Sequence, residues 1–180
     1  AEKIGFDCVT MQPNLSFNKP LQLDPAGAME DFVDACKKYG YGIELEIHHG
    51  VKNQETEKLY GEYFDFGADK CVIILPGRCE SLIYSYYFAE PYRKAGFNVL
   101  VVDTRCHGKS DGIYNTIGVK ESGDVIAWSK ILNEKFGNKE VWYHGICIGT
   151  AAGIFAITDK NCPDFVKGIV TESCCVSLRE

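Results

Sequence analysis

The stretch Gly145-Ile146-Cys147-Ile148-Gly149 separates an apolar run that ends at Tyr143 from a run of small residues that begins at Thr150. This order predicts a strand that turns sharply into a helix at Cys147, a nucleophile elbow of the form Gly-x-nucleophile-x-Gly with sulfur in place of oxygen. The glycines have a steric role, because side chains two residues before and after the nucleophile would collide across the bend. Such a turn exposes the Cys147 thiol and leaves backbone N–H groups at the helix start free to hold an anion.

The sequence around the elbow predicts alternating strands and helices. Six strands are predicted, over residues 42–47, 59–64, 71–75, 99–102, 141–143 and 168–170. The first strand strictly alternates apolar and polar residues and the second is rich in β-forming residues, so the two are typical of an antiparallel pair with one solvated face, and the other four are continuously apolar. Helices are predicted over 81–95 and 121–136, each followed by a glycine that ends it. Because the connections are short, we expect an α/β fold with a mostly parallel, doubly wound sheet.

Composition narrows the class of protein. A chain of 180 residues suits one domain, which we divide into a leader with a helix over 1–39 and a core over 40–180. The net charge of −6 gives no reason to expect nucleic acid binding, and no apolar run is long enough to cross a bilayer. The first residues lack a signal-peptide pattern, and nine irregularly spaced cysteines fit reduced thiols. We therefore expect a cytoplasmic protein that binds a small molecule and needs no cofactor or metal.

The residues that follow the third predicted strand are candidates for anion binding. Ligands of a parallel sheet collect at the carboxyl ends of its strands. The turn at 76–80 lies there, and its backbone N–H groups at Arg78 or Cys79 would complete an oxyanion site with the N–H of Ile148. In the same turn, Glu80 would lie either near the thiol or at a helix start, where the helix dipole favours a negative charge.

Two motifs in order carry a resemblance to a known family. The loop Asp103-Thr104-Arg105-Cys106-His107-Gly108-Lys109-Ser110 is similar to the Asp-x-Arg-Gly-His-Gly-x-Ser loop of bacterial esterase-like members of the α/β-hydrolase superfamily. With the elbow, the chain resembles the N-terminal part of that fold over about residues 40–172. Cys106 replaces the first loop glycine, and Cys147 replaces the usual serine, as in the dienelactone hydrolases.

The resemblance also implies parts that are missing. The family's sheet carries eight strands, with an acid after strand six or seven and a histidine after strand eight, so the predicted sheet lacks the last two strands. No histidine follows Cys147. His144 would be turned away from the thiol, and His107 is structural in the family. Glu172 is either the acid or, as we rather expect, a solvated loop carboxylate.

Three explanations of the missing parts stay open: a fragment of a longer hydrolase, which we favour, an inactive relative, or a thiolate with lesser help. A sheet that stops at its sixth strand would expose an apolar edge, so if the short chain is the natural product we expect a homodimer through that edge.

Two functions follow from the sequence. The first is a hydrolase in which Cys147 attacks an ester, thioester or lactone carbonyl. The alternative is an inactive scaffold or a thiol-based metal or redox sensor, because Cys79, Cys106, Cys147 and Cys174 would lie past neighbouring strand ends. We further expect Arg105 and Asp124 to pair and Asp103 to brace its loop.

Overall fold

A computed structural model describes residues 43–49 and 57–173 of the chain. The predicted leader over 1–39, its helix and Cys174 lie outside these residues. The elements are β1 (Ile43–His49), β2 (Glu57–Phe64), β3 (Lys70–Leu75), η1 (Leu82–Phe88), α2 (Ala89–Lys94), β4 (Asn98–Val102), α3 (Glu121–Phe136), β5 (Glu140–Ile146), α4 (Ile148–Thr158) and β6 (Val166–Glu172).

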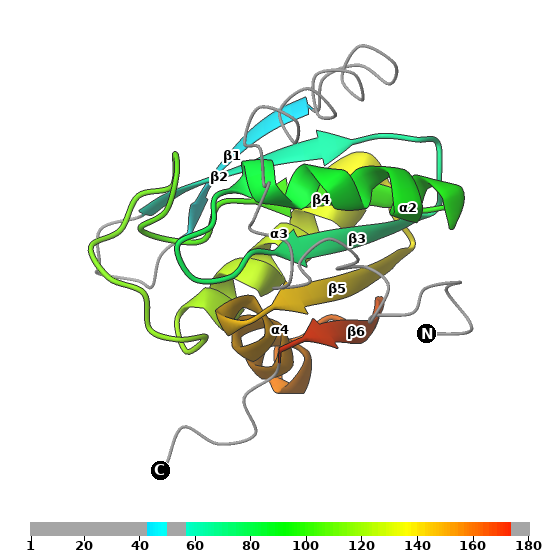
Figure 1. Ribbon diagram of the computed structural model, residues 1–180. Helices are drawn as coiled ribbons and strands as arrows, with labels where there is room; N and C mark the ends of the chain where they lie inside the picture. Colours follow the sequence, from blue (N-terminus) through cyan, green and yellow to red (C-terminus); the bar gives the residue numbers. More distant parts are fainter. Residues whose placement is uncertain (1–42, 50–56, 174–180) are drawn as a thin grey trace. The chain divides into compact units, whose positions relative to one another are not determined.

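The described strands form one sheet in the order β1-β2-β4-β3-β5-β6 (Figure 1). β1 pairs with β2 and β2 with β4 in the antiparallel sense, whereas β4, β3, β5 and β6 are parallel neighbours. Each parallel connection runs through helical structure, as right-handed crossovers require. The predicted α/β class, the antiparallel hairpin and the mostly parallel sheet are confirmed.

Helices cover both faces of the sheet. Alternate strand residues such as Ile73 and Tyr143 pack with α3 and α4 in the main core, where Trp128 and Leu132 are buried. The next residue of β5, His144, points to the opposite face and packs against the rings of η1 and α2. Because successive side chains of a strand alternate in direction, one face of β5 packs against α3 and α4 and the other face packs against η1 and α2.

The first helical segment differs from the prediction of one helix over 81–95. It begins as the 3₁₀ helix η1 and continues as the short helix α2. Pro91 explains the change, because it has no N–H to donate to the carbonyl four residues earlier. α3 has its predicted bounds and ends at Gly137, whose φ of 69° gives the left-handed cap.

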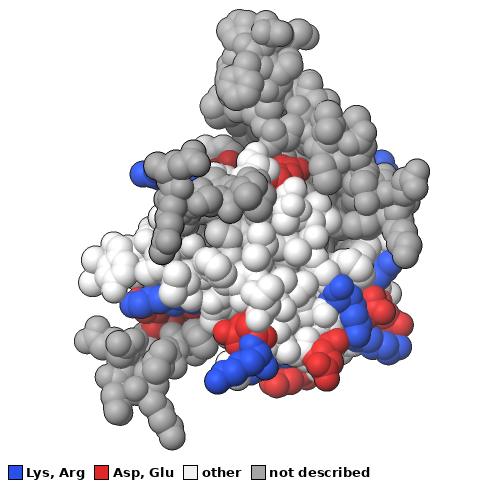
Figure 2. Space-filling model, turned by 90° about the horizontal axis from the view of Figure 1, so that it is seen from below, with Lys and Arg blue, Asp and Glu red and all other residues white. Residues whose placement is uncertain are grey.

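β6 is an edge of the described sheet, since β5 is its one hydrogen-bonded neighbour there. Figure 2, which views the molecule from the side of β6 and α4, shows a broad area without Lys, Arg, Asp or Glu, bordered by charges of both signs. Val166, Ile169 and Val170 of β6 are half-buried, and Phe155 of α4 is exposed. Among the described residues, no helix has the length and apolar composition needed to span a membrane.

Candidate active site

Cys147 lies at the turn between β5 and α4 and is exposed. Its backbone has φ 50° and ψ −114°, a region that L-residues rarely occupy. Hydrogen bonds hold this conformation: the Cys147 N–H donates to the Glu172 carbonyl at 2.9 Å, and its own carbonyl accepts from the Thr150 N–H at 3.1 Å. The predicted sharp turn with an exposed thiol is therefore present.

Both elbow glycines stand where a side chain would collide with backbone. A Cβ on Gly145 would lie 2.5 Å from Thr150 Cα, across the bend as predicted. A Cβ on Gly149 would lie 2.2 Å from the Leu75 carbonyl oxygen, because the first turn of α4 packs directly on the end of β3. Gly145 thus permits the sharp turn, and Gly149 permits the close contact between α4 and the end of β3.

The turn after β3 lies beside the nucleophile. A Cβ on Gly77 would stand 3.4 Å from Cys147 Cβ. The turn is closed by a bond from the Glu80 N–H to the Gly77 carbonyl at 3.3 Å, and Cys79 takes a left-handed conformation with φ 62°. The structure thus brings the predicted loop at Arg78 and Cys79 to the elbow, where Ile148 begins α4. The oxyanion role of these N–H groups stays a prediction.

Glu80 faces the same small space. Its carboxylate accepts the Gly77 N–H at 2.6 Å and lies in the turn before η1, so the expectation that it starts the helix is wrong. Partial burial of the ring raises the pKa of Tyr87, and the negative charges of Glu172 and Glu80 add to the rise. The charges of both carboxylates therefore act on the Tyr87 hydroxyl of η1.

Glu172 is the last residue of β6, not a solvated loop residue as expected. The residue is only 6% exposed, and its Oε1 lies 3.4 Å from His144 Nε2. The correction follows from β6 being longer than predicted, so that Glu172 pairs in register with Ile146. His144 is fully buried and its Nδ1 lies 2.9 Å from the Tyr92 hydroxyl, which agrees with the expectation that it does not serve as the base.

Thr150 and Tyr92 are residues that the sequence analysis did not single out. The Thr150 hydroxyl donates to the Gly145 carbonyl at 2.7 Å and also lies 3.1 Å from the Glu172 carbonyl oxygen. Thr150 could have been found from the sequence, because a hydroxyl among the small and apolar residues at the start of a helix indicates a hydrogen bond to nearby backbone. Tyr92 gave no signal, since its partner His144 is 52 residues away.

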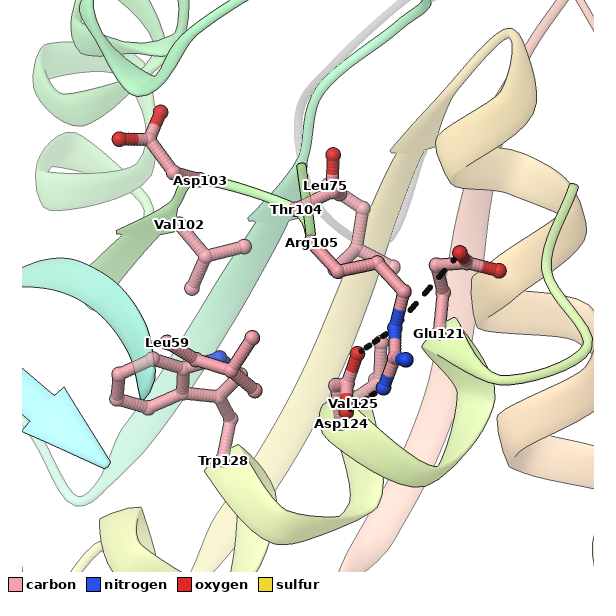
Figure 3. A pocket seen from close by; sticks show the side chains of 10 residues that line it. All are labelled: Leu59, Leu75, Val102, Asp103, Thr104, Arg105, Glu121, Asp124, Val125 and Trp128. Carbon is pink, nitrogen blue, oxygen red and sulfur yellow. Dashed lines mark hydrogen bonds and ion pairs between the residues drawn. The ribbon is translucent and has the colours of Figure 1, made fainter. Parts of the chain in front are cut away.

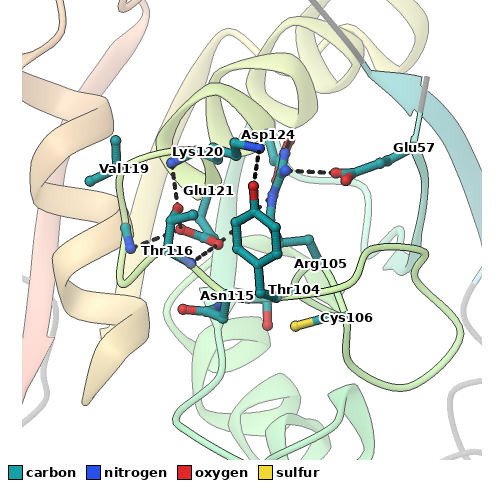
Figure 4. Close-up of polar contacts among 12 residues, drawn as sticks. Glu57, Thr104, Arg105, Cys106, Asn115, Thr116, Val119, Lys120, Glu121 and Asp124 are labelled. Carbon is teal, nitrogen blue, oxygen red and sulfur yellow. Dashed lines mark hydrogen bonds and ion pairs between the residues drawn. The ribbon is translucent and has the colours of Figure 1, made fainter. Parts of the chain in front are cut away.

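The loop after β4 is braced by a buried arginine, as predicted. Arg105 makes two parallel bonds to Asp124, from Nε at 2.8 Å and Nη2 at 2.7 Å, and its Nη1 lies 2.6 Å from Glu57 in β2 (Figure 4). Glu121 lies 3.8 Å from the same guanidinium. Burial lowers the pKa of Arg105, but Asp124 and the other carboxylates outweigh it and hold that pKa above its ordinary value. Arg105 therefore ties the loop to α3 and β2.

Asp103 and His107 complete the bracing. The Asp103 carboxylate accepts the N–H groups of Leu82 at 2.8 Å and Lys109 at 2.9 Å, which confirms its role as a brace. The ring of His107 contacts its own loop, with Nδ1 3.2 Å from Thr104 Oγ1, in agreement with a structural role.

A cavity lies beside this cluster, between the guanidinium of Arg105 and the indole of Trp128 (Figure 3). Its volume is about 10 Å³, and apolar side chains of β2, β3, β4 and α3 form much of its wall. That is room for about one water molecule, whereas sites for small-molecule ligands typically exceed about 300 Å³. This cavity is therefore not a substrate pocket.

Acid should weaken the fold through Glu121. Burial acts to raise the pKa of Glu121, but bonds from the Thr116 hydroxyl and from backbone N–H groups, including that of Gly118, outweigh burial and lower it. A lowered native pKa gives stability that is complete above the unfolded value of about 4.3 and is lost as pH falls through the native value. In urea unfolding, the stability difference between wild type and Glu121→Gln should shrink below about pH 4. A difference independent of pH would contradict this.

The thiol-cluster alternative gains no support. Within 43–49 and 57–173 there is no group of three His, Cys, Asp or Glu residues that could hold a metal ion. Cys79 and Cys147 are exposed and Cys106 is half-buried, and Cys174 lies outside the described part. Metal or redox sensing stays a prediction from the sequence.

A mostly parallel sheet with a preceding antiparallel hairpin, and an elbow after its fifth strand, defines an α/β-hydrolase fold. A family model described as alpha/beta hydrolase fold matches residues 70–178. The chain belongs to the α/β-hydrolase fold family. A comparison with curated proteins gave no match.

Solved structures give the same fold. The chain is 30% identical to an esterase from Pyrococcus furiosus, over 69% of this chain and 49% of that one, with a TM-score of 0.57. It is 21% identical to a bromoperoxidase from Bacillus anthracis, over 72% of this chain and 44% of that one, with a TM-score of 0.54. It is 16% identical to an alpha-beta serine hydrolase homologue from Coxiella burnetii, over 72% of this chain and 73% of that one, with a TM-score of 0.52. The chain spans about half the length of the esterase it matches.

Proposed function

We propose that this hydrolase-family chain acts on an ester, thioester or lactone carbonyl and that Cys147 is the nucleophile. The observation that carries the proposal is the exposed Cys147 thiol held at positive φ between two glycines whose Cβ positions are sterically blocked. A strained, water-accessible position is costly for a merely structural cysteine, which would gain free energy by being buried. The similarity to an esterase supports the substrate class.

The reaction would proceed in two steps. The Cys147 sulfur forms a bond to the carbonyl carbon while the carbonyl electrons move to oxygen, where the N–H of Ile148 and that of Arg78 or Cys79 hold the charge. The electrons return, the bond to the leaving oxygen or sulfur breaks, and the leaving group takes a proton. Water then attacks the acyl thioester, releasing the acid and restoring the thiol.

The proton transfers need a general base. Among the described residues, the carboxylate of Glu80 faces the space beside Cys147 Cβ, on the other side of Gly77. We propose that Glu80 assists removal of the thiol proton in this chain, since His144 is fully buried and enclosed by the rings of Phe88 and Tyr92.

Selective alkylation tests the nucleophile directly. At neutral pH, iodoacetamide should modify Cys147 faster than Cys79, which is also exposed but does not lie at a strand-to-helix elbow. Peptide mass spectrometry over a time course gives both rates from one sample. Equal rates at the two thiols would refute an activated Cys147.

The β6 edge gives a separate prediction about assembly. We propose that a second copy of the chain pairs along β6, because this edge has one described neighbour and carries the half-buried apolar side chains of Val166, Ile169 and Val170. Light scattering should give twice the chain mass of 20.1 kDa. Thr171→Lys, at an exposed position of β6, should shift the protein to monomer, because edge lysines oppose strand pairing. If light scattering shows the wild-type protein to be a monomer, the proposed dimer is refuted.

A further inference from the structure

Three polar side chains from different elements form a buried chain beneath the elbow. Tyr92 of α2 is 1% exposed, His144 of β5 is fully buried, and Glu172 of β6 is 6% exposed. The Tyr92 hydroxyl lies 2.9 Å from His144 Nδ1, and His144 Nε2 lies 3.4 Å from Glu172 Oε1. These three side chains thus link α2, β5 and the edge strand β6 on the face of the sheet that η1 and α2 cover.

Glu172, one of these three residues, also contacts the proposed nucleophile Cys147 through main-chain atoms. The Glu172 carbonyl accepts the Cys147 N–H at 2.9 Å and lies 3.1 Å from the Thr150 hydroxyl. His144 precedes Cys147 by three residues on β5. Glu172 therefore binds the elbow with its backbone while its side chain faces His144, so the position of one affects the other.

Packing alone does not account for these residue types. The His144 ring contacts the rings of Phe88, with centroids 4.5 Å apart, and Tyr92, with centroids 5.7 Å apart. An apolar side chain would fill this space without the free-energy cost of burying an imidazole and a carboxylate. The Tyr92–His144 hydrogen bond is directional, and the 3.4 Å approach of His144 Nε2 to Glu172 Oε1 is an electrostatic contact, so together they favour one arrangement of α2, β5 and β6.

We propose that Tyr92, His144 and Glu172 are positioning residues for Cys147. They fix the carboxyl end of β6, whose Glu172 carbonyl holds the Cys147 N–H and with it the backbone at φ 50°. The thiol is thereby kept in one direction relative to the turn at Gly77. This inference rests on the proposed role of Cys147 as nucleophile, since a small displacement of a reacting atom costs much of its rate.

A matched pair of phenylalanine variants tests the link. Tyr92→Phe removes the hydroxyl that bonds His144, and the control Tyr143→Phe removes an equally buried hydroxyl that lies 2.9 Å from Ser129 Oγ on the opposite face of β5. Hydrogen exchange of the Cys147 amide, followed by NMR, should be about fivefold to tenfold faster in Tyr92→Phe, the effect of one lost hydrogen bond. Tyr143→Phe should leave it unchanged at matched global stability.

A second pair at Glu172 separates positioning from general weakening. Glu172→Ala should speed Cys147 amide exchange and slow alkylation of the Cys147 thiol relative to Cys79. Glu172→Gln should restore both, because it keeps an oxygen near His144 Nε2.

The two pairs of variants distinguish failure of the positioning role from failure of the proposed nucleophile. If Tyr92→Phe and Glu172→Ala exchange no faster at Cys147 than Tyr143→Phe, the positioning chain is refuted. If exchange responds but wild-type Cys147 is alkylated no faster than Cys79, the chain still fixes the turn and the proposed nucleophile fails instead.

Discussion

Replacing Cys147 with alanine should lower kcat for hydrolysis of p-nitrophenyl acetate by roughly a thousandfold or more, the scale seen when a covalent nucleophile is removed. The physical reason is that the acyl group has no atom to transfer to, while the turn at Gly77 and the N–H of Ile148 remain. Alanine fits the site, because Cys147 is exposed and its Cβ is already accommodated. Release of p-nitrophenol, followed by its absorbance, measures the loss of rate directly against wild type.

Cys162 supplies the control for this experiment. It is half-buried in the connection between α4 and β6, at the other end of the strands from the elbow, and burial raises the pKa of its thiol. Cys162→Ala should retain kcat within about twofold, since changes away from the site seldom alter chemistry. Turnover that survives in Cys147→Ala would exclude this thiol as the source of activity, and equal loss in both variants would point to damage of the fold.

The sheet and the elbow were predictable because their signals are local. Continuous apolar runs predicted the buried strands, and β3 and β4 agree within one residue with the runs at 71–75 and 99–102. The elbow was predictable for a steric reason that the structure confirms, since Gly145 and Gly149 both stand where a Cβ would meet backbone. Arg105 and Asp124 were paired correctly because a charged motif and a helix start flanked one loop.

The parts that were missed depend on contacts between distant segments. β5 and β6 extend beyond their apolar runs, to Ile146 and Glu172. Pairing with neighbouring strands keeps these residues in the strands, although their own sequence favours a loop. This extension buries Glu172, so the prediction that Glu172 is a solvated loop carboxylate was wrong. The split of the first helix was within reach, because Pro91 was visible in the sequence and its missing N–H predicts a break.

Arg105→Leu should cost about 3–5 kcal/mol of unfolding free energy, the range for removing one partner of a buried ion pair. The leucine leaves the carboxylates of Asp124 and Glu121 next to one another in the protein interior, where their solvation is poor. It also frees Glu57 and so unties the loop after β4 from β2. Urea unfolding followed by circular dichroism measures the free energy of unfolding for each variant.

Arg93→Leu is the matched control, because Arg93 pairs with Glu90 on the surface of α2 with about a third of each side chain exposed. A pair of that kind contributes about 0–1 kcal/mol, so the same substitution there should hardly change stability. Arg105→Lys should fall between the two, because a lysine restores the charge but cannot make the two parallel bonds to Asp124. If Arg105→Leu loses no more stability than Arg93→Leu, the buried cluster does not hold the loop, and the bracing role of the Asp103–Ser110 motif in this chain must be abandoned.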